Sequence, residues 1–417
     1  MTPAEVRDAR HRHRASTGDI YGTTGLVQIV ISATETGRIA AECISLQVIA
    51  DHLPEFVDAC GYRWMTDAES YDLAAEVAFQ RRALFMLGKL WAETEDRTAL
   101  ASSISRIIAA QEFVTNFGLC SPRLSKPRAP HNHRILSIPA GFVELALWYS
   151  AGLRCWIARQ LQWADDQDED GGWTLVCSPV PQRDPRPFAH VSAYELIART
   201  LAESGRDRKL LGGNAALLIR EQIPELSGIS GDIDSTALPY FDQNAAYMLV
   251  EFAIAHELGH ALSESCATPP TSEELAEESA DRIGCFLLQI SAGMRTFGWG
   301  QDQLLGLTQA TLGVALFEGL IATRTCLIDG LLRRPSINGS RNARRLLQQE
   351  QLRVKVAQRT RLALLTGLAA SALEDQARIQ ALMNNSEAFV RDLATTIMTL
   401  PDAAITRAIH IAERAVE

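Results

Sequence analysis

The sequence predicts a mainly helical protein of the α+β class, with a small sheet near its functional cleft. Most segments show helical periodicity and are rich in Ala, Leu, Arg, Glu and Gln. Only two short apolar segments are typical of strands, residues 26–32 (LVQIVIS) and 173–180 (WTLVCSPV). Hydrophobic residues make up 47% of the 417 residues, which is enough to bury a sizeable core.

The predicted helices lie on both sides of a proline-containing, basic linker at residues 120–134 (CSPRLSKPRAPHNHR). We expect an N-terminal helical region, residues 1–125, to regulate the protein or bind a partner. Residues 135–417 are expected to carry the functional site and the C-terminal helices. The segments with helical periodicity are residues 36–58, 68–117, 137–163, 190–222, 302–332 and 341–415.

Composition narrows the class of protein. The net charge of −10 argues against a protein that mainly binds nucleic acid. Eight cysteines without a C-x-x-C pair are typical of reduced thiols in a cytoplasmic protein. The longest hydrophobic stretches, residues 245–262 and 304–332, are interrupted by polar and charged side chains. We therefore expect no membrane span and a cytoplasmic location.

The segment HELGHALSE, residues 256–264, lies in an apolar run that predicts a buried helix. His256 and His260 are four residues apart, so their imidazoles share one face and can reach a single metal ion. Glu257 is rotated by about 100° and can contact a water molecule on that ion without binding the ion itself. The alternative interpretation is a pair of core histidines satisfied by hydrogen bonds.

A second helix is predicted after Pro269 and Pro270, where Thr271 and Glu274 match a capping box. On this helix Glu277 and Asp281 are four residues apart and share a face. A catalytic zinc site needs a third protein ligand and an open position.

The carboxylates of this helix are the candidates for that ligand, with a solvated acidic face as the alternative. Ser263 and Cys266 stand where a metzincin would continue with Gly and His, so the third ligand must lie elsewhere. Glu277 is the first candidate, and Glu278 and Glu274 compete with it, because a helix rotated by one position presents a different carboxylate.

Residues 243–290 resemble the glutamate-ligand zincins (gluzincins), particularly the HtpX-like and ImmA/IrrE-like peptidases. These families pair H-E-x-x-H with a downstream E-x-x-x-D or E-x-x-A-[DN] on the next helix, and Ala280 also matches the second pattern. The resemblance implies zinc held by His256, His260 and Glu277, Glu257 as general base, and Asp281 as acceptor for the other N–H of a ligand histidine. Phage-exclusion peptidases of the Lit kind look similar around the motif.

The resemblance implies a zincin-like catalytic core with a small sheet, whose edge aligns the substrate backbone, and additional helical regions. The expected function is that of a bacterial zinc metallopeptidase, an endopeptidase that hydrolyses peptide bonds of an intracellular protein or peptide substrate. The alternative is a catalytically inactive, metal-binding regulatory or interaction protein with a protein partner, in stress response or phage defence. A helical interaction protein with an accidental motif is a third hypothesis.

Overall fold

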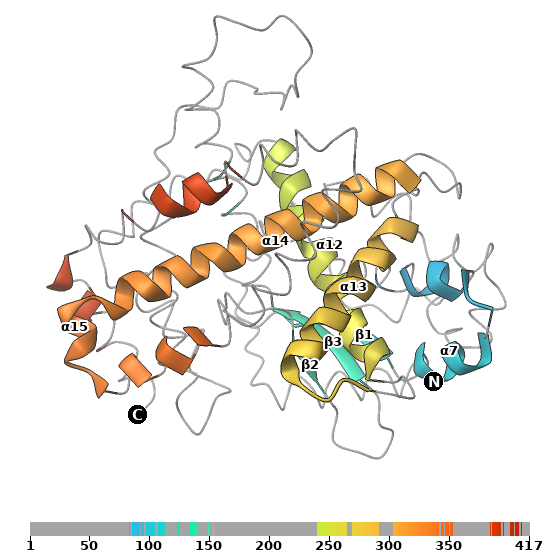
Figure 1. Cartoon of the computed structure of the whole chain (residues 1–417), viewed down its shortest axis with the longest axis horizontal. Helices are drawn as coiled ribbons and strands as arrows, with labels where there is room; N and C mark the ends of the chain where they lie inside the picture. Colours follow the sequence, from blue (N-terminus) through green and yellow to red (C-terminus); the bar gives the residue numbers. More distant parts are fainter. Residues whose placement is uncertain are drawn as a thin grey trace, which may run out of the picture.

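The computed structural model describes residues 240–264, 269–291 and 303–341, and parts of residues 83–153, 343–352 and 384–410. Figure 1 shows the long helix α14 running across the molecule, with α12 and α13 beside it. These three helices contact one another and form the core that carries the candidate site. In chain order, the elements are α7 (Arg97–Ile104), β1 (Ile107–Glu112), β2 (Arg123–Ser125), β3 (Arg134–Pro139), α12 (Tyr240–Ser263), α13 (Glu273–Ser291), α14 (Gln303–Leu332) and α15 (Pro335–Asn338).

Helix α12 is enclosed by other elements along most of its described length. Its sequence is apolar nearly all round, a pattern typical of a helix that other elements cover on every side. From Leu249 to Ser263 every residue is buried except His260, which is intermediate. The predicted buried helix is confirmed over these residues, and His260 lies at its more open side.

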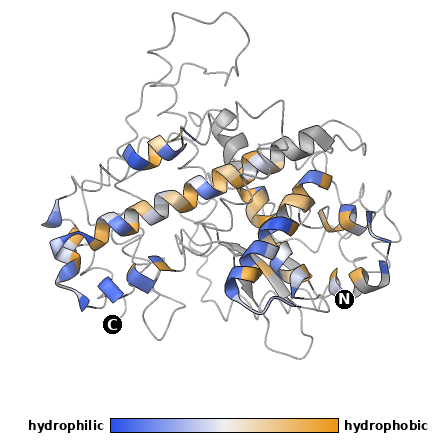
Figure 2. Ribbon diagram, viewed as in Figure 1, coloured by the Kyte–Doolittle hydropathy of each residue, from blue (hydrophilic) through white to orange (hydrophobic). Residues whose placement is uncertain are grey.

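Helix α13 is amphipathic, and hydrophilic and hydrophobic residues alternate along its ribbon in Figure 2. The Ser272 hydroxyl accepts a hydrogen bond from the backbone N–H of Leu275 at 3.2 Å, which makes Ser272 the N-cap. The capping box predicted from the sequence placed the N-cap at Thr271, and the structure has it one residue later, at Ser272. The helix runs antiparallel to α12, because Gly284 lies against His256 whereas Ala280, earlier on α13, lies against Gly259, later on α12.

Helix α14 packs against both α12 and α13. Phe317 of α14 and Phe252 of α12 meet edge to face, with ring centroids 5.2 Å apart. Within the described residues, the segment Ala310–Leu332 is long and apolar enough to cross a membrane, and 88% of its most apolar window is buried inside the molecule. Core helices of globular proteins share this combination of length, hydropathy and burial.

The described strands form a three-stranded sheet in the order β1-β3-β2. Strand β1 pairs with β3 in parallel, with Ile107 opposite Arg134, and β2 pairs with β3 antiparallel, with Leu124 opposite Leu136. Both β2 and β3 contact α12. The division into residues 1–125 and 135–417 stays a prediction.

The predicted α+β class and the predicted zincin-like core are corrected. Helices make up most of the described residues, and three packed helices form the core of that part of the chain. Strand β1 lies in residues 68–117, which were predicted to be helical, and β2 and β3 begin inside the predicted linker at residues 120–134. The segments predicted as strands, residues 26–32 and 173–180, lie outside the described residues. Local periodicity was misleading because partner strands determine where a short apolar segment becomes extended.

Candidate metal centre

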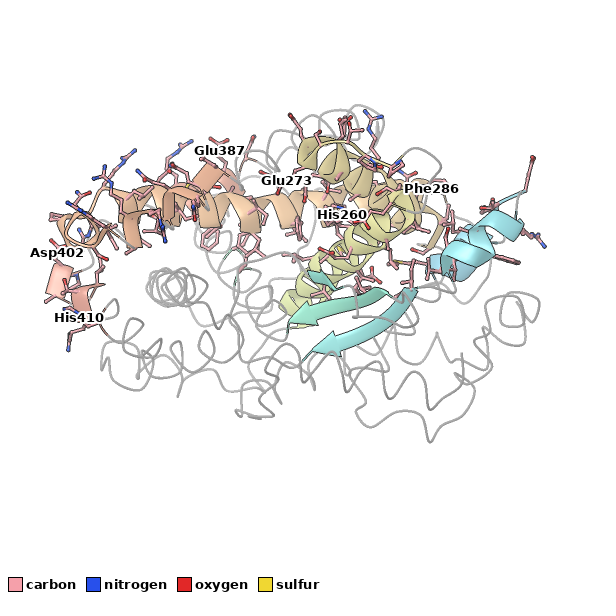
Figure 3. The ribbon with its side chains drawn as sticks, turned by 90° about the horizontal axis from the view of Figure 1, so that it is seen from below. His260, Glu273, Phe286, Glu387, Asp402 and His410 are labelled. Atoms are coloured by element: carbon pink, nitrogen blue, oxygen red, sulfur yellow. The ribbon has the colours of Figure 1, made fainter. Side chains whose placement is uncertain are left out.

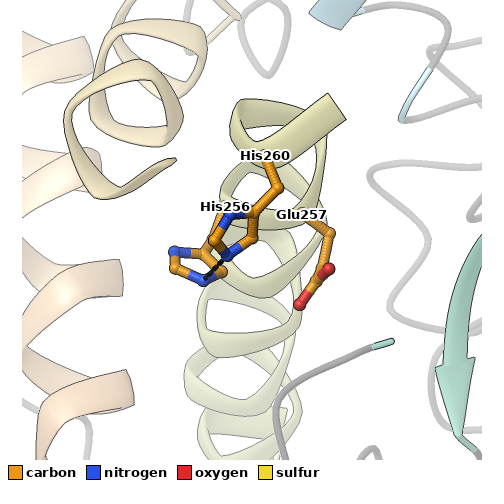
Figure 4. Close-up of side chains that lie close together, drawn as sticks. All are labelled: His256, Glu257 and His260. Atoms are coloured by element: carbon orange, nitrogen blue, oxygen red, sulfur yellow. Dashed lines mark hydrogen bonds between the residues drawn. The ribbon is translucent and has the colours of Figure 1, made fainter. Parts of the chain in front are cut away.

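The imidazole rings of the two histidines of α12 lie with their Nε2 atoms close together. The Nε2 atoms of His256 and His260 are 3.1 Å apart, and Figure 4 shows Glu257 beside them on the same helix. Ligand atoms of these three side chains all lie within 4.8 Å of one another, so the group could hold a metal ion. His256 is completely buried and Glu257 is 3% exposed, whereas the side chain of His260 is 18% exposed. Access from solvent is therefore on the side of His260.

Glu277 reaches the histidines from α13. Its Oε2 lies 3.5 Å from Nε2 of His256, and its Oε1 lies 3.5 Å from Nε2 of His260. One carboxylate of the opposite helix thus faces both imidazoles. His256, His260 and Glu277, the three metal ligands suggested by the sequence, therefore lie together.

The two competing carboxylates lie elsewhere. Glu278 pairs with Arg282, four residues further along α13, at 2.6 Å, and the Arg282 side chain is 70% exposed. Glu274 is exposed in the first turn of the helix. The rotation of α13 about its own axis thus separates Glu277 from Glu278, and Glu274 lies about one turn away at the exposed start of the helix, although sequence spacing left all three open.

Asp281 holds the imidazole of His256 from its other side. Its Oδ1 lies 2.7 Å from Nδ1 of His256, and both side chains are 1% exposed. A proton assigned to Nδ1 donates to this carboxylate and leaves Nε2 as the nitrogen with a lone pair. Metal-binding histidines are commonly oriented in this way by a carboxylate.

The charges around His260 favour its protonated form. Burial lowers its pKa, but the hydrogen bond to Glu277 and the negative charges of Glu257, Glu277 and Asp281 together raise the pKa above its ordinary value. The nearby thiol of Cys285 behaves differently, because burial and the charge of Asp281 raise its pKa strongly. Burial therefore favours the protonated form of this thiol.

Two phenylalanine rings lie near the imidazole of His256. Only one of them is close to His256 in the sequence. The ring of Phe317 lies 6.0 Å from the imidazole and that of Phe252 lies 6.1 Å from it, between ring centroids. Phe252 is one turn before His256 on α12, so its spacing was a usable signal. Phe317 comes from α14, a separate helix much further along the chain, and nothing in its local sequence marked it.

No family model, no curated protein and no solved structure matches this chain. The chemistry of the site therefore rests on the side chains that α12 and α13 bring together.

Proposed function

We propose that this chain is a zinc-dependent endopeptidase with a glutamate as third metal ligand, similar in its site residues to the HtpX-like and ImmA/IrrE-like peptidases. The observation that carries the proposal is the position of Glu277, whose two oxygens each lie 3.5 Å from one histidine Nε2. Two imidazoles and one carboxylate match the ligand set of catalytic zinc sites that keep a fourth position open. The substrate is an intracellular protein or peptide, and the protein acts in the bacterial cytoplasm.

The chain's own residues have separate roles in this proposal. His256, His260 and Glu277 would bind the ion, and Asp281 would hold His256 in the tautomer that leaves Nε2 for the metal. Zinc in such a site polarises a carbonyl and lowers the pKa of a water from 15.7 to about 7. Glu257, one residue after His256, would take a proton and then give it to the leaving amine.

The test compares the wild-type protein with Glu257→Gln, measuring bound zinc by elemental analysis and cleavage of candidate proteins by mass spectrometry. We expect the variant to retain one zinc per chain and to lose about 100- to 10,000-fold in cleavage rate, the usual contribution of a general base. It should also trap uncut substrate in pull-down experiments. Unchanged cleavage by the variant would rule out Glu257 as the base, and a wild-type protein without stoichiometric metal would refute the proposal.

A metal-binding regulatory protein without catalysis is the second candidate. Burial favours it, since His256 is completely buried and Glu257 is only 3% exposed, as in a structural metal site. This candidate predicts that zinc raises the melting temperature while neither the wild type nor Glu257→Gln cleaves any protein. The same experiment therefore separates the two functions.

A further inference from the structure

Two glycines bring α12 and α13 into backbone contact next to the candidate ligands. A Cβ added to Gly259 would lie 2.5 Å from the backbone oxygen of Ala280, and one added to Gly284 would lie 3.0 Å from the backbone nitrogen of His256. Non-bonded heavy atoms are most stable about 3.5–4.0 Å apart. A side chain at Gly259 therefore cannot fit unless the two helices separate, and one at Gly284 requires a smaller shift of the His256 backbone.

These contacts lie within the metal centre itself. Gly259 directly precedes His260, and Ala280 directly precedes Asp281. The backbone of His256 is itself the surface against which Gly284 packs. The ion pairs that join the two helices at the site span this contact: Glu277 lies 3.5 Å from each histidine, and Asp281 lies 2.7 Å from Nδ1 of His256.

We propose that Gly259 and Gly284 are positioning residues of the metal centre, an inference that rests on the metal binding proposed above. They hold α12 and α13 close enough for Glu277 and Asp281 to reach the histidines. Relief of a 2.5 Å contact requires a shift of about 1 Å between the helices. Metal–ligand distances tolerate only about 0.2 Å, so a shift of this size weakens ligation even when the helices remain folded.

Gly313 of α14 provides a matched control. A Cβ added there would lie 3.2 Å from Cβ of Phe252 and 3.3 Å from the backbone oxygen of Met248, so Gly313→Ala also crowds the helical core. Both of these neighbours belong to the part of α12 that precedes the histidines, and neither is a proposed metal ligand. The variant thus measures the effect of crowding at a helix contact that involves no proposed metal ligand directly.

The experiment uses the full chain as wild type, Gly259→Ala, Gly284→Ala and Gly313→Ala. Circular dichroism and melting temperature report folding, chelator competition reports zinc affinity, and the visible absorption of bound cobalt reports ligand geometry. We expect Gly284→Ala to bind zinc about 10- to 100-fold more weakly, with an altered cobalt spectrum. Gly259→Ala should have the larger effect because its contact is closer, and Gly313→Ala should lower only the melting temperature.

The outcomes of this experiment separate failure of the inference from failure of the proposed function. If folded Gly284→Ala binds zinc with wild-type affinity and gives the wild-type cobalt spectrum, the inference is wrong while the proposed function stands. If Gly313→Ala weakens zinc binding equally, the glycines act only through general packing, and the inference is again wrong. A wild-type chain that binds neither zinc nor cobalt overturns the proposed function and the inference together. Should Gly259→Ala not fold, the milder Gly284→Ala decides the question.

Discussion

Glu277 and Glu278 are neighbours in the sequence with different surroundings in the structure. Glu277 faces both imidazoles at 3.5 Å, and its side chain is 21% exposed. Glu278 faces Arg282 at the surface of α13. Consecutive helical residues point about 100° apart, and of these two only Glu277 points toward the histidines. The pair is therefore an internal control for the third ligand.

We predict that Glu277→Gln lowers zinc affinity by more than about 100-fold, whereas Glu278→Gln leaves it unchanged. Even residues that only orient a ligand usually contribute 10- to 100-fold, and loss of a ligand should exceed that. Both variants remove one negative charge from the same helix, so they differ only in location. Chelator competition on the two purified variants gives the measurement, and equal affinities would exclude Glu277 as a ligand.

At the scale of the elements, α14 packs against α12, the helix that carries the histidines. Phe317 is completely buried and packs on Phe252 and on the imidazole of His256, so it links α14 to the helix that carries the histidines. Phe286 of α13 is 44% exposed and is labelled on that helix in Figure 3. Phe317 is therefore a core phenylalanine and Phe286 a partly exposed one, so the two can be compared.

We predict that Phe317→Ala lowers the free energy of unfolding by about 3–5 kcal/mol, because it removes buried apolar surface and leaves a cavity. Phe286→Ala should lower it less, because 44% of that residue is exposed and less buried apolar surface is lost. Urea denaturation of both variants, with the zinc-free protein as reference, measures the difference. Similar losses in the two variants would contradict the placement of Phe317 at the centre of the core.

At the scale of the whole molecule, protonation of His260 links stability to pH. The pKa of His260 is raised in the folded protein, since burial lowers it but Glu277, Glu257 and Asp281 raise it more. A group with a raised folded pKa stabilises the fold fully below its unfolded pKa, and that stabilisation disappears as the pH rises through the folded pKa. Zinc competes with the same proton, so its binding changes in the opposite direction.

We therefore predict that the zinc-free protein loses unfolding free energy as the pH rises above 6.5, the ordinary pKa of histidine, through the pKa of folded His260. Zinc affinity should increase over the same interval. Other groups titrate as well, so the informative quantity is the difference between wild type and His260→Gln, measured by thermal unfolding in chelator at several pH values. A difference that does not depend on pH would contradict the raised pKa.

Much of the site was predictable because it depends on local spacing. Residues four apart on a helix share a face, and this relation alone places His256 with His260 and Glu277 with Asp281. The apolar run around the histidines also predicted a buried helix there. Spacing could not choose among Glu274, Glu277 and Glu278, since the rotation of α13 against α12 depends on the packing of both helices. The contact between the backbones at Gly259 and Ala280 belongs to that packing.

The fold was less predictable than the site. Strand β1 lies in a segment predicted to be helical, and β2 and β3 lie at a predicted linker, because strands depend on partners far away in the sequence. A glycine inside a helix costs about 1 kcal/mol of stability relative to alanine. Gly259 and Gly284 lie inside helices, so their presence indicated close packing, but the sequence did not show which backbone packs against them.

The sequence by itself determined which residue types lie on each helix face, since that follows from the 3.6-residue period of the helix. It thus determined that α12 offers two imidazoles and a neighbouring carboxylate, and that α13 offers carboxylates four residues apart. Only the tertiary structure decided that Glu277 faces both imidazoles, that Asp281 orients His256, and that Phe317 packs behind them. These relations depend on how closely and at what rotation separate helices pack, and that is determined by contacts between residues distant in the chain.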